Sequence, residues 1–325
     1  MIHQMPLLEI KNLKVDFFSN GARLRAIDDV SLTMDAGETV CLVGESGCGK
    51  SVTALSIARL IPSPPAHYPA GEILLDKRDV LKMSNSELRG IRGAMVSYVF
   101  QEPGASLNPV FQIGSQIKEM LKLHRPKDAT REEVLRLLAL VGLPDPELRM
   151  ANYPFEMSGG MQQRVMIAMA LAAQPRLLVA DEPTTALDVT IQAQILDLLK
   201  HLRNELGMAI LLITHNLGIV GDMADRVAVM YAGQIVELAQ AREMLRRPLH
   251  PYTKALIGSV PKLTDGQQRL TSIPGTVPSL GAFPPGCRFY PRCPSARPKC
   301  ATTMPELVEI EKERWVRCLY AEPNP

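Results

Sequence analysis

The sequence predicts an α/β protein built around a largely parallel sheet. Three short segments contain apolar runs without alternation, as in strands buried on both faces, at residues 38–45, 176–182 and 208–215. Segments with helical periodicity alternate with them, at residues 51–60, 161–173 and 189–206. Alternation of strands and helices along a chain is typical of a parallel sheet covered by helices.

The composition excludes several classes of protein. Of 325 residues, 46% are hydrophobic and 22% charged, so the chain is not predominantly disordered. Lys and Arg number 36 against 34 Asp and Glu, a net charge of +2, which argues against a dedicated nucleic-acid binder. No apolar run approaches the roughly 20 residues of a spanning helix, and the N-terminus lacks a secretory h-region. We expect a cytoplasmic protein that can dock onto a membrane protein.

The N-terminal half begins with β-structure. Residues 7–35 alternate in part on either side of a turn signal at residues 19–21, which predicts strands joined by that turn. After Gln101 the character changes, because Pro and Asn residues mark a loop and residues 111–142 are mostly helical in period. A turn is expected at residues 143–147.

The second half continues the alternation. The helix predicted at residues 189–206 should end at Gly207, and residues 225–239 read as a hairpin around Ala232-Gly233. After about residue 258 the chain becomes rich in proline and carries four of its six cysteines, with little periodicity. We therefore predict a main domain over residues 1–258 and a compact, loop-rich, Cys- and Pro-rich C-terminal extension over residues 259–325.

A glycine-rich segment between the first buried strand and its helix matches the pattern G-x-x-x-x-G-K-[ST]. It consists of Gly44, Glu45, Ser46, Gly47, Cys48, Gly49, Lys50 and Ser51. Glycines let backbone N–H groups turn toward phosphate oxygens, and the following helix N-terminus favours an anion. Lys50 is expected to reach the β and γ phosphates and Ser51 to hold Mg²⁺, whereas Cys48 reads as a small tolerated residue. The segment predicts a P-loop NTPase (RecA-like) core.

Two acids follow the second buried strand. Asp181 ends it and is expected to hold Mg²⁺ through water, and Glu182 comes next. A carboxylate in that position can polarise the water that attacks the γ-phosphate. The pair therefore predicts ATP hydrolysis with Mg²⁺.

The segment Ser158-Gly159-Gly160, within residues 157–164, resembles the LSGGQ signature of ATP-binding cassette (ABC) ATPases, although Met157 and Met161 depart from it. The resemblance covers residues 7 to about 320. It implies an ABC nucleotide-binding domain with an antiparallel β subdomain and a helical subdomain at about residues 102–164. It also implies that residues 158–160 bind the γ-phosphate of a partner subunit's ATP.

Further positions match other motifs of the same family. Gln101 resembles the Q-loop glutamine that senses Mg²⁺, Ala186-Leu187-Asp188 resembles the D-loop, and His215 resembles the switch histidine that contacts the γ-phosphate. Phe17 resembles the aromatic residue that stacks on adenine. Phe18 is adjacent, and the choice between them stays open beside the alternative of an ordinary core phenylalanine.

The C-terminal region narrows the resemblance. Residues 250–256, 284–294 and 316–320 resemble the corresponding part of oligopeptide/dipeptide importer ATPases, and of their D-type subunit above all. This implies peptide uptake powered by a heterodimer with a second homologous ATPase, two transmembrane permease subunits and an extracytoplasmic peptide-binding protein, at the cytoplasmic side of the membrane. Nickel, glutathione or another small solute is the alternative cargo, and a soluble ABC ATPase is the alternative class.

Four late cysteines, Cys287, Cys293, Cys300 and Cys318, are spaced C-x5-C-x6-C-x17-C. Thiolates suit iron–sulfur clusters or zinc, but zinc sites usually contain a closer C-x2-4-C pair. The family resemblance implies a [4Fe-4S] cluster here, and zinc or free or oxidised cysteines remain as alternatives. A Pro-rich segment with no core of its own would gain stability from such a metal site.

Overall fold

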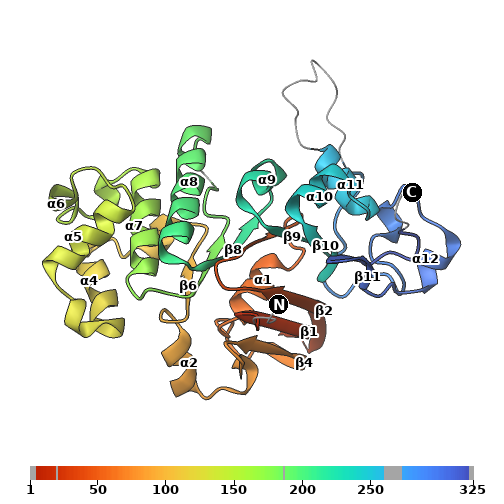
Figure 1. Ribbon diagram of the computed structural model, residues 1–325. Helices are drawn as coiled ribbons and strands as arrows, with labels where there is room; N and C mark the ends of the chain where they lie inside the picture. Colours follow the sequence, from red (N-terminus) through yellow and green to blue (C-terminus); the bar gives the residue numbers. More distant parts are fainter. Residues whose placement is uncertain (1–4, 20, 186, 260–272, 322–325) are drawn as a thin grey trace. The chain divides into compact units, whose positions relative to one another are not determined.

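The computed structural model describes residues 5–19, 21–185, 187–259 and 273–321. The chain forms two compact units, and Figure 1 labels many of their helices and strands. Unit 1 comprises residues 1–35, 39–82 and 213–325, and unit 2 comprises residues 36–38 and 83–212. Both units combine strands with helices, which confirms the predicted α/β class.

An antiparallel sheet in unit 1 has the strand order β2-β1-β4-β5. Its strands are β1 (Leu8–Ser19), β2 (Ala22–Met34), β4 (Ala66–Leu75) and β5 (Arg78–Asp79). The predicted hairpin is confirmed, since β1 pairs with β2 in the register Leu8 to Met34 and Ser19 to Ala22. Asn20, within the predicted turn, lies outside the described residues.

A second set of strands in unit 1 follows the order β11-β12-β10-β9-β3. Strand β3 (Thr39–Val43) is buried at every residue and runs parallel to β9 (Arg226–Tyr231), as its apolar run predicts. Strands β9 and β10 (Gln234–Gln240) form the predicted hairpin. Ala232 and Gly233 both have positive φ, at 46° and 82°, as a tight two-residue hairpin turn requires.

The C-terminal residues are more ordered than their composition suggests. Strands β11 (Val308–Glu311) and β12 (Arg314–Val316) form a hairpin, and β12 pairs with β10. Within the extension that is predicted to be loop-rich, this hairpin supplies two short strands that join the sheet of unit 1 through β10. Short strands with only three or four residues carry too little alternation for a sequence pattern to reveal them.

The helices of unit 1 are short. They are α1 (Lys50–Ser56), α9 (Val220–Met223), α10 (Ala241–Arg246), α11 (Pro251–Gly258) and α12 (Pro298–Thr302), with 3-10 turns η1 (Val80–Lys82), η4 (Leu217–Ile219) and η5 (Tyr290–Arg292). Helix α1 ends before the predicted Leu60, and Arg59 adopts a positive φ of 48° that a helix cannot continue.

Unit 2 contains the strand order β8-β7-β6, with β6 (Val96–Val99) parallel to β7 (Leu177–Asp181). Strand β8 (Ala209–Thr214) carries the chain into unit 1 after Leu212. All six residues of β8 and the first four of β7 are buried, as their apolar runs predict. Strand β6 belongs to residues 61–100, which the sequence analysis leaves unassigned.

The helices of unit 2 include the predicted helical region. They are α2 (Asn85–Ile91), α3 (Pro103–Ser106), α4 (Ile113–His124), α5 (Arg131–Leu140), α6 (Pro146–Arg149), α7 (Gly159–Leu171) and α8 (Val189–Leu206), with η2 (Pro126–Asp128) and η3 (Pro154–Glu156). The predicted helical stretch 111–142 divides at Arg125-Pro126, because proline cannot continue a helix. Helices α3, α4 and α5 contact α7. Figure 1 labels α4, α5 and α7.

Helix α8 ends as predicted at Gly207, whose φ of 65° and N–H bond to the Arg203 carbonyl close its C-terminus. No helix in the described part of the chain is both long and apolar enough to cross a bilayer.

Gly233 gives a test of this fold. A Cβ added there would lie 2.3 Å from the Ala26 carbonyl oxygen, whereas one added at Gly207 would meet nothing within 4 Å. Both residues have positive φ, so both Ala variants are strained, but only Gly233→Ala also forces a backbone clash. We expect Gly233→Ala to lower the free energy of unfolding by about 2–4 kcal/mol and Gly207→Ala by about 1 kcal/mol, measured by urea denaturation. Equal losses would contradict the packing of this hairpin.

Candidate functional site

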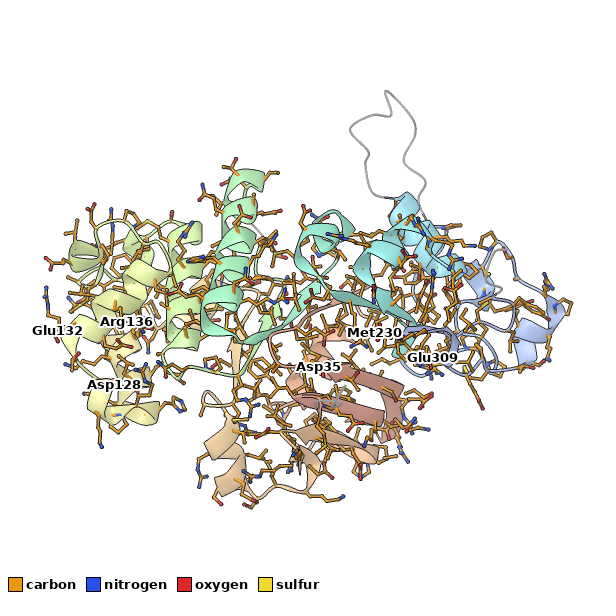
Figure 2. The ribbon with its side chains drawn as sticks, in the orientation of Figure 1. Asp35, Asp128, Glu132, Arg136, Met230 and Glu309 are labelled. Carbon is orange, nitrogen blue, oxygen red and sulfur yellow. The ribbon has the colours of Figure 1, made fainter. Side chains whose placement is uncertain are left out.

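The phosphate-binding loop lies in unit 1 between β3 and α1, in the context that its motif predicts. Its glycines are required by close packing against β9 and β2. A Cβ at Gly44 would lie 2.2 Å from the carbonyl oxygen of Met230, the β9 residue labelled in Figure 2. A Cβ at Gly49, whose φ is 108°, would lie 2.7 Å from Ile27 Cδ1. The loop can therefore approach these strands only with glycine at both positions.

The Lys50 side chain is turned into the loop. Its Nζ donates to the carbonyl oxygens of Gly44 at 2.8 Å and Glu45 at 3.1 Å, and Cys48 Sγ lies 3.9 Å away. Lys50 is buried, whereas Ser46, Gly47 and Ser51 are exposed. The loop thus presents an open side with backbone and hydroxyl donors, and its lysine is held beneath it by two carbonyl groups.

Cys48 has an internal role in the loop. Its side chain is buried, and burial raises the pKa of its thiol above the usual value. Its N–H donates to the Glu45 carbonyl at 3.3 Å, and its own carbonyl accepts from Gly233 N at 2.8 Å. The side chain therefore packs as a small apolar residue, in agreement with the interpretation of Cys48 as a tolerated residue.

The two acids lie in unit 2 at the end of β7, as predicted. Asp181 is the last residue of the strand, and Glu182 follows with a positive φ of 47°. Glu182 Oε2 accepts hydrogen bonds from Thr185 Oγ1 at 2.9 Å and from Gln101 Nε2 at 3.4 Å. The structure therefore brings together two predicted residues, Gln101 and Glu182, and adds Thr185, which no sequence motif singled out.

His215 follows β8 in unit 1 and is exposed. The residues predicted to bind the phosphates and to activate water are thus divided between the units: Lys50, Ser51 and His215 belong to unit 1, and the acids belong to unit 2. Their individual roles remain predictions.

The signature segment begins α7. Ser158 caps this helix by accepting from Met161 N at 3.4 Å, and both Ser158 and Gly159 are exposed. A Cβ at Gly160 would lie 2.8 Å from Ile191 Cγ2, so this glycine permits close packing against α8. The exposed first turn offers N–H groups to an anion, which is the property that the predicted role requires.

The D-loop residue Asp188 caps α8 by accepting from Ile191 N at 2.9 Å, and its side chain is exposed. This capping bond explains the residue structurally. Its predicted contact with nucleotide stays a prediction, and Ala186 lies outside the described residues.

Phe17 and Phe18 lie near the end of β1. Phe17 is half-buried opposite Leu24 and Ala66, and Phe18 is 52% exposed with its ring 6.1 Å from that of His67. Phe18 is too exposed to be an ordinary core residue. The choice of adenine-stacking residue remains open between the two.

The four late cysteines approach one another without forming a metal site. Burial raises the pKa of Cys287 to about 11, and the nearby thiols of Cys318 and Cys300 add to the rise. Burial is also the main cause of the raised pKa of Cys293, and the same two thiols contribute. Cys287 N also donates to the Cys300 carbonyl at 2.8 Å. All four are free thiols, and among the described residues no group of three or more His, Cys, Asp or Glu side chains is arranged to hold a metal ion. The iron–sulfur ligand set is thus without structural support.

Comparisons with known proteins agree with the site. The family model "ABC transporter" matches residues 27–185, and "Oligopeptide/dipeptide transporter, C-terminal region" matches residues 236–300. A third model, an AAA domain described as a putative AbiEii toxin of a type IV toxin–antitoxin system, matches residues 151–221 only.

Named relatives match the chain over almost its whole length. The dipeptide transport ATP-binding protein DppD of Bacillus subtilis (strain 168) is 49% identical over 96% of this chain and 94% of its own. The oligopeptide transport ATP-binding protein AppD of the same organism is 49% identical over 97% of both chains.

A solved structure shows the same fold. It is a dimeric, post-hydrolysis state of the ATP-binding cassette MJ0796 bound to ADP and Pi, with a TM-score of 0.64 and 28% identity. The match covers 72% of this chain and 99% of that one. With the phosphate loop, the acid pair and the capped signature helix in place, the chain belongs to the ATP-binding proteins of ABC transporters, in the group that carries the oligopeptide/dipeptide transporter C-terminal region.

Proposed function

We propose that this chain is the ATP-hydrolysing subunit that powers uptake of di- and oligopeptides through a membrane ABC importer. The observation that carries the proposal is the end-to-end similarity to proteins named for dipeptide and oligopeptide transport, at 49% identity over nearly the whole chain. Those names favour peptides over nickel or glutathione as cargo, and they favour a transporter over a soluble ABC ATPase.

The proposed chemistry assigns roles to the residues of both units. Lys50 neutralises charge on the β and γ phosphates, and His215 contacts the γ-phosphate. Ser51, Asp181 and Gln101 are the residues that would hold Mg²⁺, which when bound neutralises charge on the transferred phosphoryl group. Glu182 accepts the proton of the attacking water. Its carboxylate is oriented for that role by the Thr185 hydroxyl, 2.9 Å from Oε2.

The proposed assembly places each ATP between two ATPase subunits. Ser158, Gly159, Gly160 and Asp188 would face the nucleotide of a partner, and the dimeric arrangement of the 28% identical cassette supports this. This chain would lie on the cytoplasmic side of the membrane with a second homologous ATPase as its partner. Two transmembrane permease subunits and an extracytoplasmic peptide-binding protein would complete the importer. We also propose the division into a nucleotide-binding domain, residues 1–258, and a transporter-type C-terminal region.

Glu182→Gln tests the proposed function. The amide is nearly isosteric with the carboxylate but cannot accept the proton of water, so ATP binding should persist while turnover falls by about 100-fold or more. We expect the variant to be isolated from native membranes in mild detergent with the same permease subunits, second ATPase and binding protein as wild type, but without peptide uptake in vesicles. Isolation with ribosomes or DNA, or normal turnover, would refute the proposal.

Thr185 provides a second test, of the positioning of Glu182. Thr185→Val keeps the shape of the side chain and removes the hydroxyl donor, whereas Thr185→Ser keeps the donor. Since one hydrogen bond contributes about 1 kcal/mol, we expect kcat for ATP to fall about fivefold in Thr185→Val with little change in nucleotide affinity. Thr185→Ser should retain activity. An equal effect of both variants would mean that packing of the residue, and not its hydroxyl, matters.

We further propose that the four C-terminal cysteines take up a [4Fe-4S] cluster. Two observations support this proposal. Thiolates are soft ligands suited to iron, and neighbouring thiols raise the pKa of Cys287, Cys293 and Cys318, which shows that these side chains lie near other thiols. Because no group of side chains among the described residues is arranged to hold a metal, formation of a cluster would require these loops to rearrange.

Anaerobic purification tests the cluster. We expect a brown protein with about four iron atoms per chain and a thiolate-to-iron absorption band, both lost in Cys293→Ser. Cys41→Ser is a matched control, because Cys41 lies in β3 and is fully buried away from the C-terminal region. A colourless anaerobic sample without iron would leave four free thiols, as the structure shows them.

A further inference from the structure

The second residue of the phosphate-binding loop is held by one side chain from α11 and one from the C-terminal region. Glu45 N donates to the Tyr252 hydroxyl at 3.0 Å. The Arg292 guanidinium donates in bidentate fashion to the Glu45 carboxylate, from Nη1 to Oε2 at 2.7 Å and from Nη2 to Oε1 at 2.9 Å. These contacts join positions separated by 207 and 247 residues in the sequence. Each lies within unit 1.

Contacts other than those with Glu45 also hold the Arg292 side chain in place. The residue is only 8% exposed, its Nε donates to the Pro274 carbonyl at 2.7 Å, and its guanidinium lies 5.7 Å from the centre of the Tyr231 ring. A planar guanidinium fixed in this way matches a carboxylate in one geometry, which a lysine cannot reproduce. The hydrogen bonds to Glu45 are the main reason that the pKa of Arg292 is raised, so its charge is permanent.

Tyr252 is equally fixed. It lies in α11 and is fully buried, with ring centres 4.7 Å from Tyr231 and 5.4 Å from Phe289. Burial raises its pKa, so the hydroxyl stays neutral and accepts the Glu45 N–H. The carbonyl groups of Gly44 and Glu45, on either side of that N–H, are the two that hold the Lys50 ammonium group. A continuous line of contacts therefore runs from the C-terminal region to the phosphate-binding lysine.

The charge of Glu45 gives Arg292 a second role. Glu45 contributes a carboxylate to a loop that receives a triphosphate, and like charges at short range repel. The bidentate guanidinium cancels this charge locally and keeps the carboxylate directed at the C-terminal region. Without Arg292 the loop would present a half-exposed, uncompensated negative charge beside the site of the nucleotide phosphates.

We propose that Arg292 and Tyr252 are positioning residues for nucleotide binding: together they orient Glu45, neutralise its charge and hold the loop in the form that receives Mg·ATP. The inference rests on the ATP-binding role proposed for this loop. It makes the transporter-type C-terminal region part of the nucleotide site, with Arg292 one residue before Cys293.

A matched control is available in the same region. Arg317 is as deeply buried as Arg292, at 3% exposed, and pairs with a carboxylate, Asp29, at 3.0 Å. Asp29 belongs to β2 and not to the phosphate loop. Arg317→Gln therefore removes a buried arginine–carboxylate pair of the C-terminal region without touching Glu45.

The experiment measures binding of Mg·AMP-PNP to the full-length chain by calorimetry. Because the coupling between two sites in one protein is typically 5–150-fold, we expect Arg292→Gln to weaken binding about tenfold and Arg317→Gln to change it by less than about twofold. Tyr252→Phe keeps the ring packing and loses the acceptor, with an expected loss of about threefold. In the assembled transporter, Arg292→Gln should raise KM for ATP and leave kcat at saturation largely unchanged.

The double variant Glu45→Gln/Arg292→Gln tests whether Arg292 acts by neutralising the charge of Glu45. Removing both charges leaves no uncompensated carboxylate, so affinity should return to within about threefold of wild type. Two results would overturn the inference. One is an equal loss of nucleotide affinity in Arg292→Gln and Arg317→Gln. The other is a double variant whose affinity does not recover, together with wild-type affinity in Tyr252→Phe. A wild-type chain that binds no nucleotide would instead refute the proposed function, and this inference with it.

Discussion

The nucleotide site depends on the close approach of the phosphate loop to the buried strands of unit 1. Strand β3 delivers the loop, and its parallel partner β9 supplies the Met230 carbonyl against which Gly44 packs. At the hairpin tip, Gly233 N donates to the Cys48 carbonyl and Gly233 O accepts from Asp28 N, so the loop, β2 and the hairpin share backbone bonds. With the glycines packed to contact distance, the loop has little freedom to take another shape.

Ion pairs made by buried arginines join the C-terminal region to the rest of unit 1. Four of its arginines are at most 8% exposed, and each pairs with a carboxylate: Arg288 with Asp28, Arg292 with Glu45, Arg314 with Glu237 and Arg317 with Asp29. Removing one partner of such a pair leaves an uncompensated buried charge, so these contacts specify where the region docks. A segment with little apolar periodicity is thereby attached through ion pairs, together with the pairing of β12 with β10 and the packing of Phe289.

Sequence patterns predicted the elements whose signal is local. Strands β3, β7 and β8 are mostly apolar runs without alternation, and α8 is bounded by the capping Asp188 and by Gly207 with its positive φ. The patterns did not reveal β6, β11 or β12, because three or four residues are too few for a periodicity. The proposed cluster ligands were expected from spacing and resemblance, and spacing alone does not bring four thiols into one coordination sphere.

The amino-acid sequence alone predicts the class of the protein, the place of the phosphate loop and the residues of the acid pair, because glycine, lysine and strand-end carboxylates are dictated by local backbone geometry and chemistry. The folded chain adds the contact of Thr185 with Glu182 and the contacts of Arg292 and Tyr252 with Glu45. The contacts to Glu45 join residues more than 200 positions apart. They arise from burial and docking of the whole unit, which a local pattern does not encode.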